Sequence, residues 1–354
     1  MTALDFAALN AAIPPFDTES ADLAREHWAA VAKPLGSLGV LEDAVVQLAG
    51  IMGTPNPEIR DRAVLVFCAD NGVVAQGVTQ CGQEVSTLVA DSVAAGTSSV
   101  AVMAKTVRAQ VVSVDVGLAT PPSNPCVVGC SVAPGTADMT EGPAMTPEQA
   151  AAAIDVGIDA AHSMRSRGFD ILCAGEMGIG NTTTSSAIAS VLMGLDPTVS
   201  VGRGAGLDDE GLARKEAAVR RAIQVNAPDP ADAFDVLCKV GGFDICAMAG
   251  LYIGGALCGM PVVVDGLVSA VAALAASRLC PACTHAMLAS HISTEPATVA
   301  ILEALDLHPP INAGMRLGEG SGAVALLPLL DMALAVYDAA SFDDLGMDAY
   351  EELS

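Results

Sequence analysis

Aromatic residues are scarce in this sequence. The 354-residue chain holds one tryptophan, three tyrosines and seven phenylalanines, although 52% of its residues are hydrophobic. Its apolar residues are therefore mostly aliphatic, as in the continuous runs that form buried parallel strands. This composition favours an α/β protein and argues against an all-β sandwich. The length suffices for one large domain or two ordinary ones, with a sizeable core.

Basic residues are also few, 16 against 41 acidic ones, and the formal net charge is −25. A chain so acidic is repelled by nucleic acids and by anionic membrane surfaces, so we expect neither as a partner. The first twenty residues carry acidic side chains and no basic segment, unlike a secretory signal. The ten cysteines form no repeating framework. We therefore expect a cytoplasmic protein with reduced thiols.

Long hydrophobic runs are limited to residues 245–264, twenty residues without a charge. That is about the length of a membrane span. The run contains Pro261 and four glycines, and acidic residues flank it at Asp244 and Asp265. We therefore predict a buried helix from Asp244 to about Cys258, followed by a short strand.

Short aliphatic runs that each end in a polar residue recur along the chain. They are "AVLVFCAD", "VVSVDVG", "FDILCAGE", "PVVVDG" and "HAMLASH". Between them lie Ala-rich segments of helical length, 83–105, 147–167, 182–194, 208–225, 232–258 and 266–279. This alternation predicts an α/β fold with a mostly parallel, doubly wound, Rossmann-like sheet. The polar residues fall at strand carboxyl ends, where such folds bind ligands.

Both chain ends differ from this pattern. Residues 18–32 and 39–52 predict helices, as does the strongly apolar segment 324–340. We expect residues 1–60 and 324–354 to form a small helical domain, and residues 61–323 a large α/β catalytic domain. The Pro- and Gly-rich stretch 120–146 predicts a long loop, and long loops in compact domains are often functional.

The stretch "CAGEMGIGNTTTSSAIASVL" (173–192) runs from a strand through glycines into a helix. Glycines allow close backbone approach to an anion, and a helix N-terminus attracts phosphate. Candidate phosphate-binding residues are Gly178, Gly180, Asn181, Thr182 and Thr183. No GK[ST] follows, so this is not a Walker A motif. An ordinary strand-to-helix turn capped by Asn or Thr is the alternative.

In "RLGEGSGA" (316–323), Gly318, Gly320 and Gly322 flank Glu319 just before an apolar helix. A carboxylate there could cap the helix that follows, because the helix dipole favours it. Capping does not require so many glycines. They indicate that something packs against the backbone beside the carboxylate.

Three other segments carry weaker signals. The loop within 69–86 could wall a flat ligand or be a plain connection. "SHISTEP" (290–296) places His291 near Ser293 and Glu295, but the chain has no G-x-S-x-G elbow, which favours a binding or structural histidine. Lys215 belongs to a rare basic cluster and could reach a phosphate or lie on a solvated face.

"CPACTH" (280–285) contains a C-x-x-C pair, Cys280 and Cys283. A zinc site would need a second such pair or a histidine pair, and neither is present. We expect no metal and no cofactor.

Taken together, the motifs follow a known order: "KPLGSLG", "ADNGV", "GEMGIGNTT", "DVLCKVGGFDI", "PVVVDG", "SHISTEP" and "RLGEGSGA". The chain resembles the nicotinate-nucleotide–dimethylbenzimidazole phosphoribosyltransferase family over essentially its whole length. The resemblance implies an α/β domain, a small helical domain from both ends, and a homodimer. It also implies transfer of 5-phosphoribosyl from nicotinate mononucleotide to an aromatic base, giving an α-ribotide for cobamide assembly.

The resemblance further implies roles for individual residues. Glu319 would be the catalytic base and Glu176 a second essential carboxylate. The acceptor base would lie beside Gln80, Cys81 and Val89. Phosphate and ribose would be bound near Gly178, Gly180, Asn181, Thr182, Thr183, Lys215, Ser293, Gly318 and Gly320.

The sequence departs from the family pattern at the acceptor side. Asn71 replaces a histidine, and Cys81 and Val89 replace Ser and Gln of benzimidazole-using relatives. Adenine or a phenol therefore remains an alternative acceptor, and a heterodimer with a homologous chain an alternative assembly. A non-catalytic partner subunit is a further alternative, but the retained Glu319 and Glu176 argue for activity.

Overall fold

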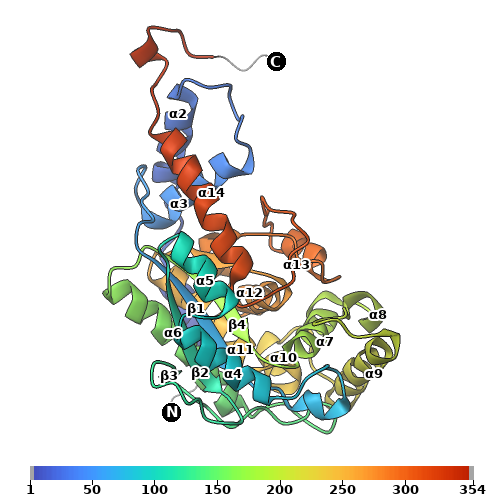
Figure 1. The fold of residues 1–354 in the computed structure, drawn as a ribbon. Coiled ribbons are helices and arrows are strands. Elements are labelled where there is room, and N and C mark those ends of the chain that lie inside the picture. The colour runs from blue at the N-terminus through green and yellow to red at the C-terminus, as the bar shows by residue number, and fades with distance from the viewer. Residues whose placement is uncertain (1–3, 351–354) are drawn as a thin grey trace.

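The computed structural model describes residues 4–350 and contains one six-stranded, all-parallel sheet (Figure 1). The strands lie in the order β3-β2-β1-β4-β5-β6. The α/β fold with a parallel, doubly wound sheet is confirmed. The strands are β1 (Arg62–Ala69), β2 (Gln110–Gly117), β3 (Val128–Gly129), β4 (Ile171–Met177), β5 (Val262–Val264) and β6 (Met287–Ala289).

The direction of winding reverses between β1 and β4, the two central strands. Beside β1, Phe67 is paired with Glu176 and Cys68 with Met177 of β4. Ligands in such sheets bind in the crevice beyond the strand carboxyl ends at this switch point. The topology therefore places a site beyond Ala69 and Met177.

Helices cover both faces of the sheet. Along β1, Leu65 and Phe67 belong to one hydrophobic layer, and Val64 and Val66 belong to the other. The first layer includes α6 (Pro147–Ser166), α7 (Asn181–Met193), α10 (Ala233–Val240), α11 (Phe243–Leu257) and α12 (Leu267–Leu279). The second includes α4 (Glu84–Ala94), α5 (Ser99–Thr106) and most of α14 (Ser321–Tyr337).

Smaller elements surround this core. At the right of Figure 1, α9 packs on α7 and α8. The remaining elements are α8 (Pro197–Ser200), α9 (Asp209–Asn226), α13 (Thr298–Ala304) and the 3-10 helices η1 (Gly72–Gln76), η2 (Pro281–Ala286) and η3 (Asp343–Leu345).

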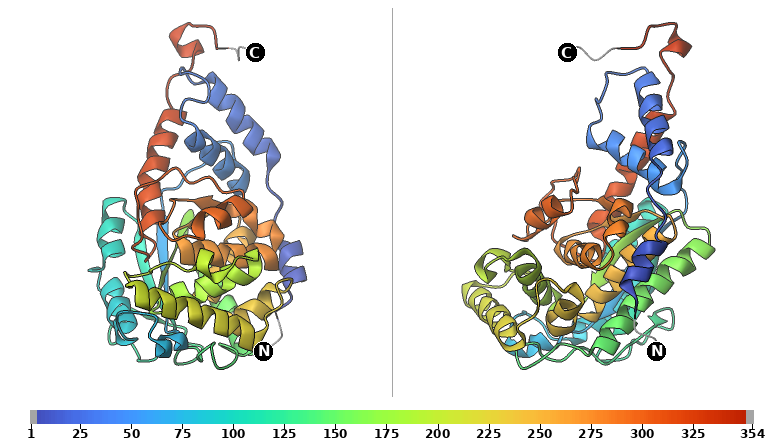
Figure 2. Two further views of the ribbon diagram at one scale, coloured as in Figure 1. Left: turned by 90° about the vertical axis from the view of Figure 1, so that its right-hand side faces the viewer. Right: turned by 180° about the vertical axis from the view of Figure 1, so that it is seen from behind.

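The two ends of the chain meet in a helical cap, formed by α2 (Thr18–Ala30), α3 (Val40–Met52) and the second half of α14. Trp28, Val45 and Tyr337 share its core, and the Tyr337 hydroxyl donates to the Pro55 carbonyl at 2.7 Å. The helices lie side by side in every view (Figure 2). By contrast, α1 (Phe6–Ala12) packs on α11 and η2. The domain boundaries at 60/61 and 323/324 stay a prediction.

Two predicted helices are each divided. Segment 83–105 forms α4 and α5, because Gly96 has φ +72° and the Ser98 side chain caps the next helix. Segment 232–258 forms α10 and α11, which are separated by Gly241 and Gly242. The predicted division of 244–264 into a helix and a strand is confirmed by α11 and β5.

Glu84–Thr106 is the single helical stretch, within residues 4–350, whose length and hydropathy would suffice to cross a membrane. It is the same segment that divides into α4 and α5. Both helices pack against β2, so this stretch forms part of one layer of the core.

Candidate active site

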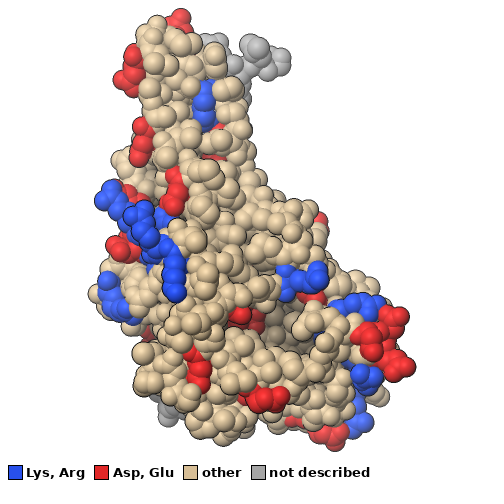
Figure 3. Space-filling view, viewed as in Figure 1, with Lys and Arg blue, Asp and Glu red and all other residues tan. Residues whose placement is uncertain are grey.

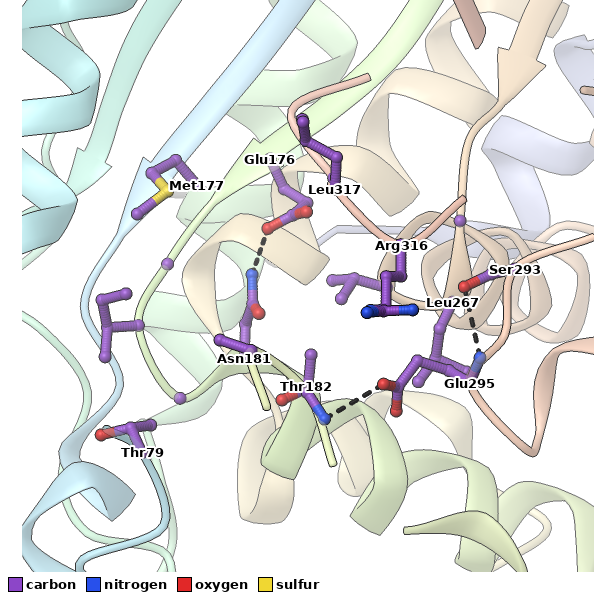
Figure 4. Close-up of a pocket in the computed structure, with 18 of the residues that line it drawn as sticks. Thr79, Glu176, Met177, Asn181, Thr182, Leu267, Ser293, Glu295, Arg316 and Leu317 are labelled. Carbon is purple, nitrogen blue, oxygen red and sulfur yellow. Dashed lines mark hydrogen bonds between the residues drawn. The ribbon is translucent and has the colours of Figure 1, made fainter. Parts of the chain in front are cut away.

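A cavity of about 300 Å³ lies beyond the carboxyl end of β4. Its walls come from the loop after β4, the start of α7, the 203–207 segment and residues 316–319. In the space-filling view the molecule is hollowed in this region, with charged side chains nearby (Figure 3). The close-up shows Glu176 on one side and Glu295 on the other (Figure 4).

Most of the predicted site residues line this cavity. Thr183, Gly320 and Cys81 do not: Thr183 is fully buried, Gly320 packs against β4, and the Cys81 carbonyl accepts from the Thr79 hydroxyl at 2.8 Å. Those that line it are Gln80, Val89, Glu176, Gly178, Gly180, Asn181, Thr182, Lys215, Ser293, Gly318 and Glu319.

The loop after β4 is a tight turn. Gly180 has φ +96°, a conformation that favours glycine. The N–H groups of Asn181 and Thr183 donate to the Gly178 and Gly180 carbonyls at 3.1 and 2.8 Å. These two helix N–H groups are therefore bonded within the turn, and the hydroxyl of Thr182 contacts the cavity's buried lysine.

That lysine is Lys215 of α9, which is fully buried rather than solvated. Its Nζ donates to the Thr182 hydroxyl at 2.8 Å and to the Gly202 carbonyl at 3.0 Å. Burial lowers the pKa of Lys215 to about 8. A position on a solvated face, the alternative for Lys215, applies instead to Arg220 of the same basic cluster. Arg220 pairs with Asp196 on the outside of α9.

Glu319 adopts a left-handed backbone conformation with φ +61°. Its Oε2 accepts from the Val100 N–H at 3.1 Å, in the first turn of α5. The alternative in which Glu319 caps the helix that follows it is thus wrong, because the carboxylate caps α5. The group that packs against the backbone at Glu319 is strand β4 of the protein itself. A Cβ on Gly175 of that strand would lie 2.5 Å from the Glu319 carbonyl oxygen.

Asp265, which follows β5, caps α14 instead. Its two oxygens accept from the N–H groups of Gly320, Gly322 and Ala323 at 3.2, 2.6 and 3.1 Å. His291 lies 3.9 Å from the same carboxylate. These contacts hold the N-terminus of α14, and with it the loop that carries Glu319.

Glu176 ends β4 inside a group of acids. Its Oε2 accepts from Asn181 Nδ2, which also donates to Asp244 Oδ2 at 3.0 Å. Burial, and then the nearby charge of Asp244, raise the pKa of Glu176 to about 8. Burial raises the pKa of Asp244 to about 6. The two carboxyl groups at the cavity thus differ: Glu319 is held by a helix N–H, whereas Glu176 favours its neutral form.

Sequence reasoning assigned no role to Arg203, Arg316 and Asp265, which also line the cavity, and left Glu295 without a site role. The Arg316 side chain points into the cavity (Figure 4). The Glu295 carboxylate accepts from the Gly204 N–H at 3.1 Å, next to the phosphate candidates. Arg316 is the first residue of "RLGEGSGA", so in a chain poor in cations its position was a usable signal.

No group of three or more His, Cys, Asp or Glu that could hold a metal occurs in the part of the chain that the structure describes. Cys280 and Cys283 are buried in the turn that follows α12, and the Cys280 thiol donates to the Phe6 carbonyl at 3.4 Å. Burial raises the pKa of both thiols. The chemistry that the side chains offer at the cavity is that of an acid, a base and anion-binding cations.

This combination of a Rossmann-like sheet with anion-binding groups and a base at its switch point suits transfer of a phosphorylated sugar. The phosphoribosyltransferase family model matches residues 13–347. The chain is 43% identical to the nicotinate-nucleotide–dimethylbenzimidazole phosphoribosyltransferase of Ruminiclostridium cellulolyticum, covering 96% of this chain and 97% of that one. It is 42% identical to the enzyme of the same name from Chloroflexus aggregans, covering 96% and 97%.

The structural comparison agrees. The crystal structure of CobT from Thermus thermophilus superposes with a TM-score of 0.89 at 38% identity, covering 93% of this chain and 99% of that one. The chain therefore belongs to the nicotinate-nucleotide–dimethylbenzimidazole phosphoribosyltransferase family.

Proposed function

We propose that this enzyme transfers the 5-phosphoribosyl group of nicotinate mononucleotide to a benzimidazole-type base. The products are an α-ribotide and nicotinate, and the ribotide serves cobamide nucleotide-loop assembly. The names of its relatives support this assignment. The observation that carries it is Glu319, a carboxylate held at the wall of the cavity that Lys215 and Thr182 also line.

The donor phosphate is bound at the Lys215 end. Lys215 and the Thr182 hydroxyl already contact each other, and Ser293 lines the same cavity. A phosphate that displaces this contact would accept from both groups, and charge-assisted bonds of this kind are the strong ones. Arg203 and Arg316 provide further positive charge at the cavity.

Transfer breaks the bond between ribose C1′ and the pyridinium nitrogen, which leaves as a neutral ring. The transition state has oxocarbenium character, as in glycoside cleavage. One ring nitrogen of the acceptor attacks C1′ from the opposite face, which converts the β linkage to α. Glu319 takes the N–H proton from the other ring nitrogen. Its Oε2 is bound by the Val100 N–H, so its other oxygen remains for the proton.

The acceptor lies beside Gln80 and Val89, where Leu317 and Met177 add apolar surface. Asn71 replaces the family's histidine, but it is fully buried and is not among the cavity-lining residues. Its Nδ2 donates to the Ile179 carbonyl at 3.4 Å. This departure therefore does not contact the acceptor, whereas Val89 does face the cavity. A benzimidazole is favoured, with adenine or a phenol as the alternative acceptor.

The test is a chromatographic assay of the purified protein with nicotinate mononucleotide and a panel of benzimidazoles, adenine and phenols. Benzimidazoles should give ribotide and an equal amount of nicotinate. If only adenine or phenols are converted, the acceptor is adenine or a phenol and not a benzimidazole. No product from any acceptor would favour the non-catalytic partner subunit.

We further propose a homodimer in the cytoplasm. All ten cysteines are free, which supports a reducing compartment. Light scattering of the purified chain should give twice the chain mass. A monomer that gains activity only with a homologous chain would instead support the heterodimer.

A further inference from the structure

Asp244 is fully buried, and the reaction described above assigns it no part. It lies in the first turn of α11, directly after Gly242 and Phe243. Asn181 donates through one nitrogen, Nδ2, to both Asp244 and Glu176. An amide nitrogen carries two hydrogens, so it can serve both carboxyl groups at once. One side chain thus holds two acids together next to the cavity.

The two acids have different surroundings. Asp244 lies at a helix N-terminus, whose dipole stabilises a negative charge. Glu176 lies at the end of a strand, without that support. Two charged carboxylates in a buried site repel each other, so such a pair retains one proton at neutral pH. The surroundings place that proton on Glu176 and the charge on Asp244.

Three further carboxylates act on the pair, and the cavity that Glu176 lines also holds the cations Lys215, Arg203 and Arg316. Asp265 after β5 and Glu319 before α14 act on Glu176, and Asp70 after β1 acts on Asp244. These carboxylates favour retention of the proton, whereas the cavity's cations oppose it. Burial and the carboxylate charges account for the raised pKa values of Glu176 and Asp244, about 8 and about 6.

We propose that Asp244 is a positioning residue for the transfer reaction: through Asn181 it orients Glu176, and its negative charge keeps Glu176 protonated. Glu176 Oε2 is engaged by Asn181, so Oε1 carries the hydroxyl. A Cβ on Gly318 would lie 2.6 Å from that oxygen, so it faces the loop that carries Glu319. Glu176 then donates a hydrogen bond to bound substrate while Glu319 accepts a proton.

This inference rests on the proposed function, and the first test is the pH profile of kcat at saturating donor. At saturating donor the enzyme stays fully bound to donor, so weaker donor binding on deprotonation of Lys215 does not affect the profile. Wild type should lose activity above about pH 8, as Glu176 deprotonates. Asp244→Asn keeps the shape and an oxygen for Asn181 but removes the charge. The descending limb should therefore move to lower pH by about one unit or more, with little change in KM for the donor.

If Asp244 has a purely structural role, Asp244→Asn should lower kcat or thermal stability without moving the descending limb of the pH profile. That result would overturn the proposal. Glu303→Gln, on the exposed side of α13, is the charge-matched control and should leave the profile unchanged. If wild type forms no ribotide at all, the proposed function fails. If wild type is active and the limb does not move, only this inference fails.

A second measurement needs no folded Asp244 variant. In wild-type protein carrying ¹³C at glutamate Cδ, one carboxyl resonance should titrate near pH 8. It should be missing from Glu176→Gln, which identifies it. A spectrum in which every glutamate has titrated by about pH 6 would contradict the proposal, because an ordinary glutamate titrates near 4.

Discussion

At the scale of single residues, Glu319 combines an unusual backbone with the proposed chemistry. A non-glycine residue in the left-handed region costs about 1 kcal/mol or more. Glycines on both sides of it, with φ +83° and +88°, extend the same conformation, and Asp265 holds the N–H groups that follow. The fold thus stabilises a backbone shape that turns the Glu319 carboxylate towards Val100 and the cavity.

Glu319→Gln should lower kcat by about 100- to 10,000-fold, because the amide cannot accept the acceptor's proton. The Gln oxygen can still accept from the Val100 N–H, so folding and donor affinity should remain. Quenched time-point assays give kcat, and isothermal titration calorimetry gives the donor Kd. An unchanged kcat would remove Glu319 from the role of base.

Lys215→Met should weaken donor binding with a smaller effect on kcat, since it removes the buried cation that faces the phosphate. In wild type, donor affinity should fall as pH rises through about 8, because Lys215 carries its charge only below its pKa. Calorimetry across pH measures both effects. Arg221→Met, which removes a surface ion pair with Glu141, is the control and should leave the donor Kd unchanged.

At the scale of elements, β4 and the loop before α14 meet backbone to backbone. Gly175 allows this contact, because any side chain there would collide with the Glu319 carbonyl. Gly175→Ala should therefore shift Glu319 and lower kcat by about 100-fold, at a stability cost of about 1 to 3 kcal/mol. Gly129→Ala on β3 meets no atom within 4 Å and is the matched control for both kcat and Tm.

Most elements could be predicted because their signals are local. Five strands are aliphatic runs that end in polar residues, whereas β3, with two exposed residues, carries no such signal. The division between α10 and α11 depends on Gly241 and Gly242, which a continuous apolar pattern conceals. Glu176 and Glu319 lie in recognisable glycine-rich segments. The link between Asn181 and Asp244 joins residues 63 positions apart, and no local pattern indicates it.

At the scale of the whole molecule, α14 joins the two parts. Its first half packs on the sheet and its second half belongs to the cap. Arg62 of β1 also pairs with Asp331 in the middle of this helix. A helix shared by two cores couples their stability, so the protein should unfold as one unit.

The single tryptophan, Trp28, lies in the cap with its ring 4.9 Å from that of Tyr337. Its fluorescence therefore reports the cap, while far-UV circular dichroism mainly reports the helices of the large part. On heating, both signals should change at one midpoint. Two separate midpoints would show that the cap unfolds on its own.

The shared helix also has a consequence for biosynthesis. Ribosomes extend a chain by about 5 to 20 residues per second, and domains generally fold from the N-terminus onwards. Here α2 and α3 precede β1 in the chain, yet α14, the helix that completes their core, follows β6. The loop carrying Glu319 emerges just before α14. The core that α2 and α3 share with α14 can therefore close only after the whole sheet has been made, and a product truncated before Glu319 would lack both the closed cap and the proposed base.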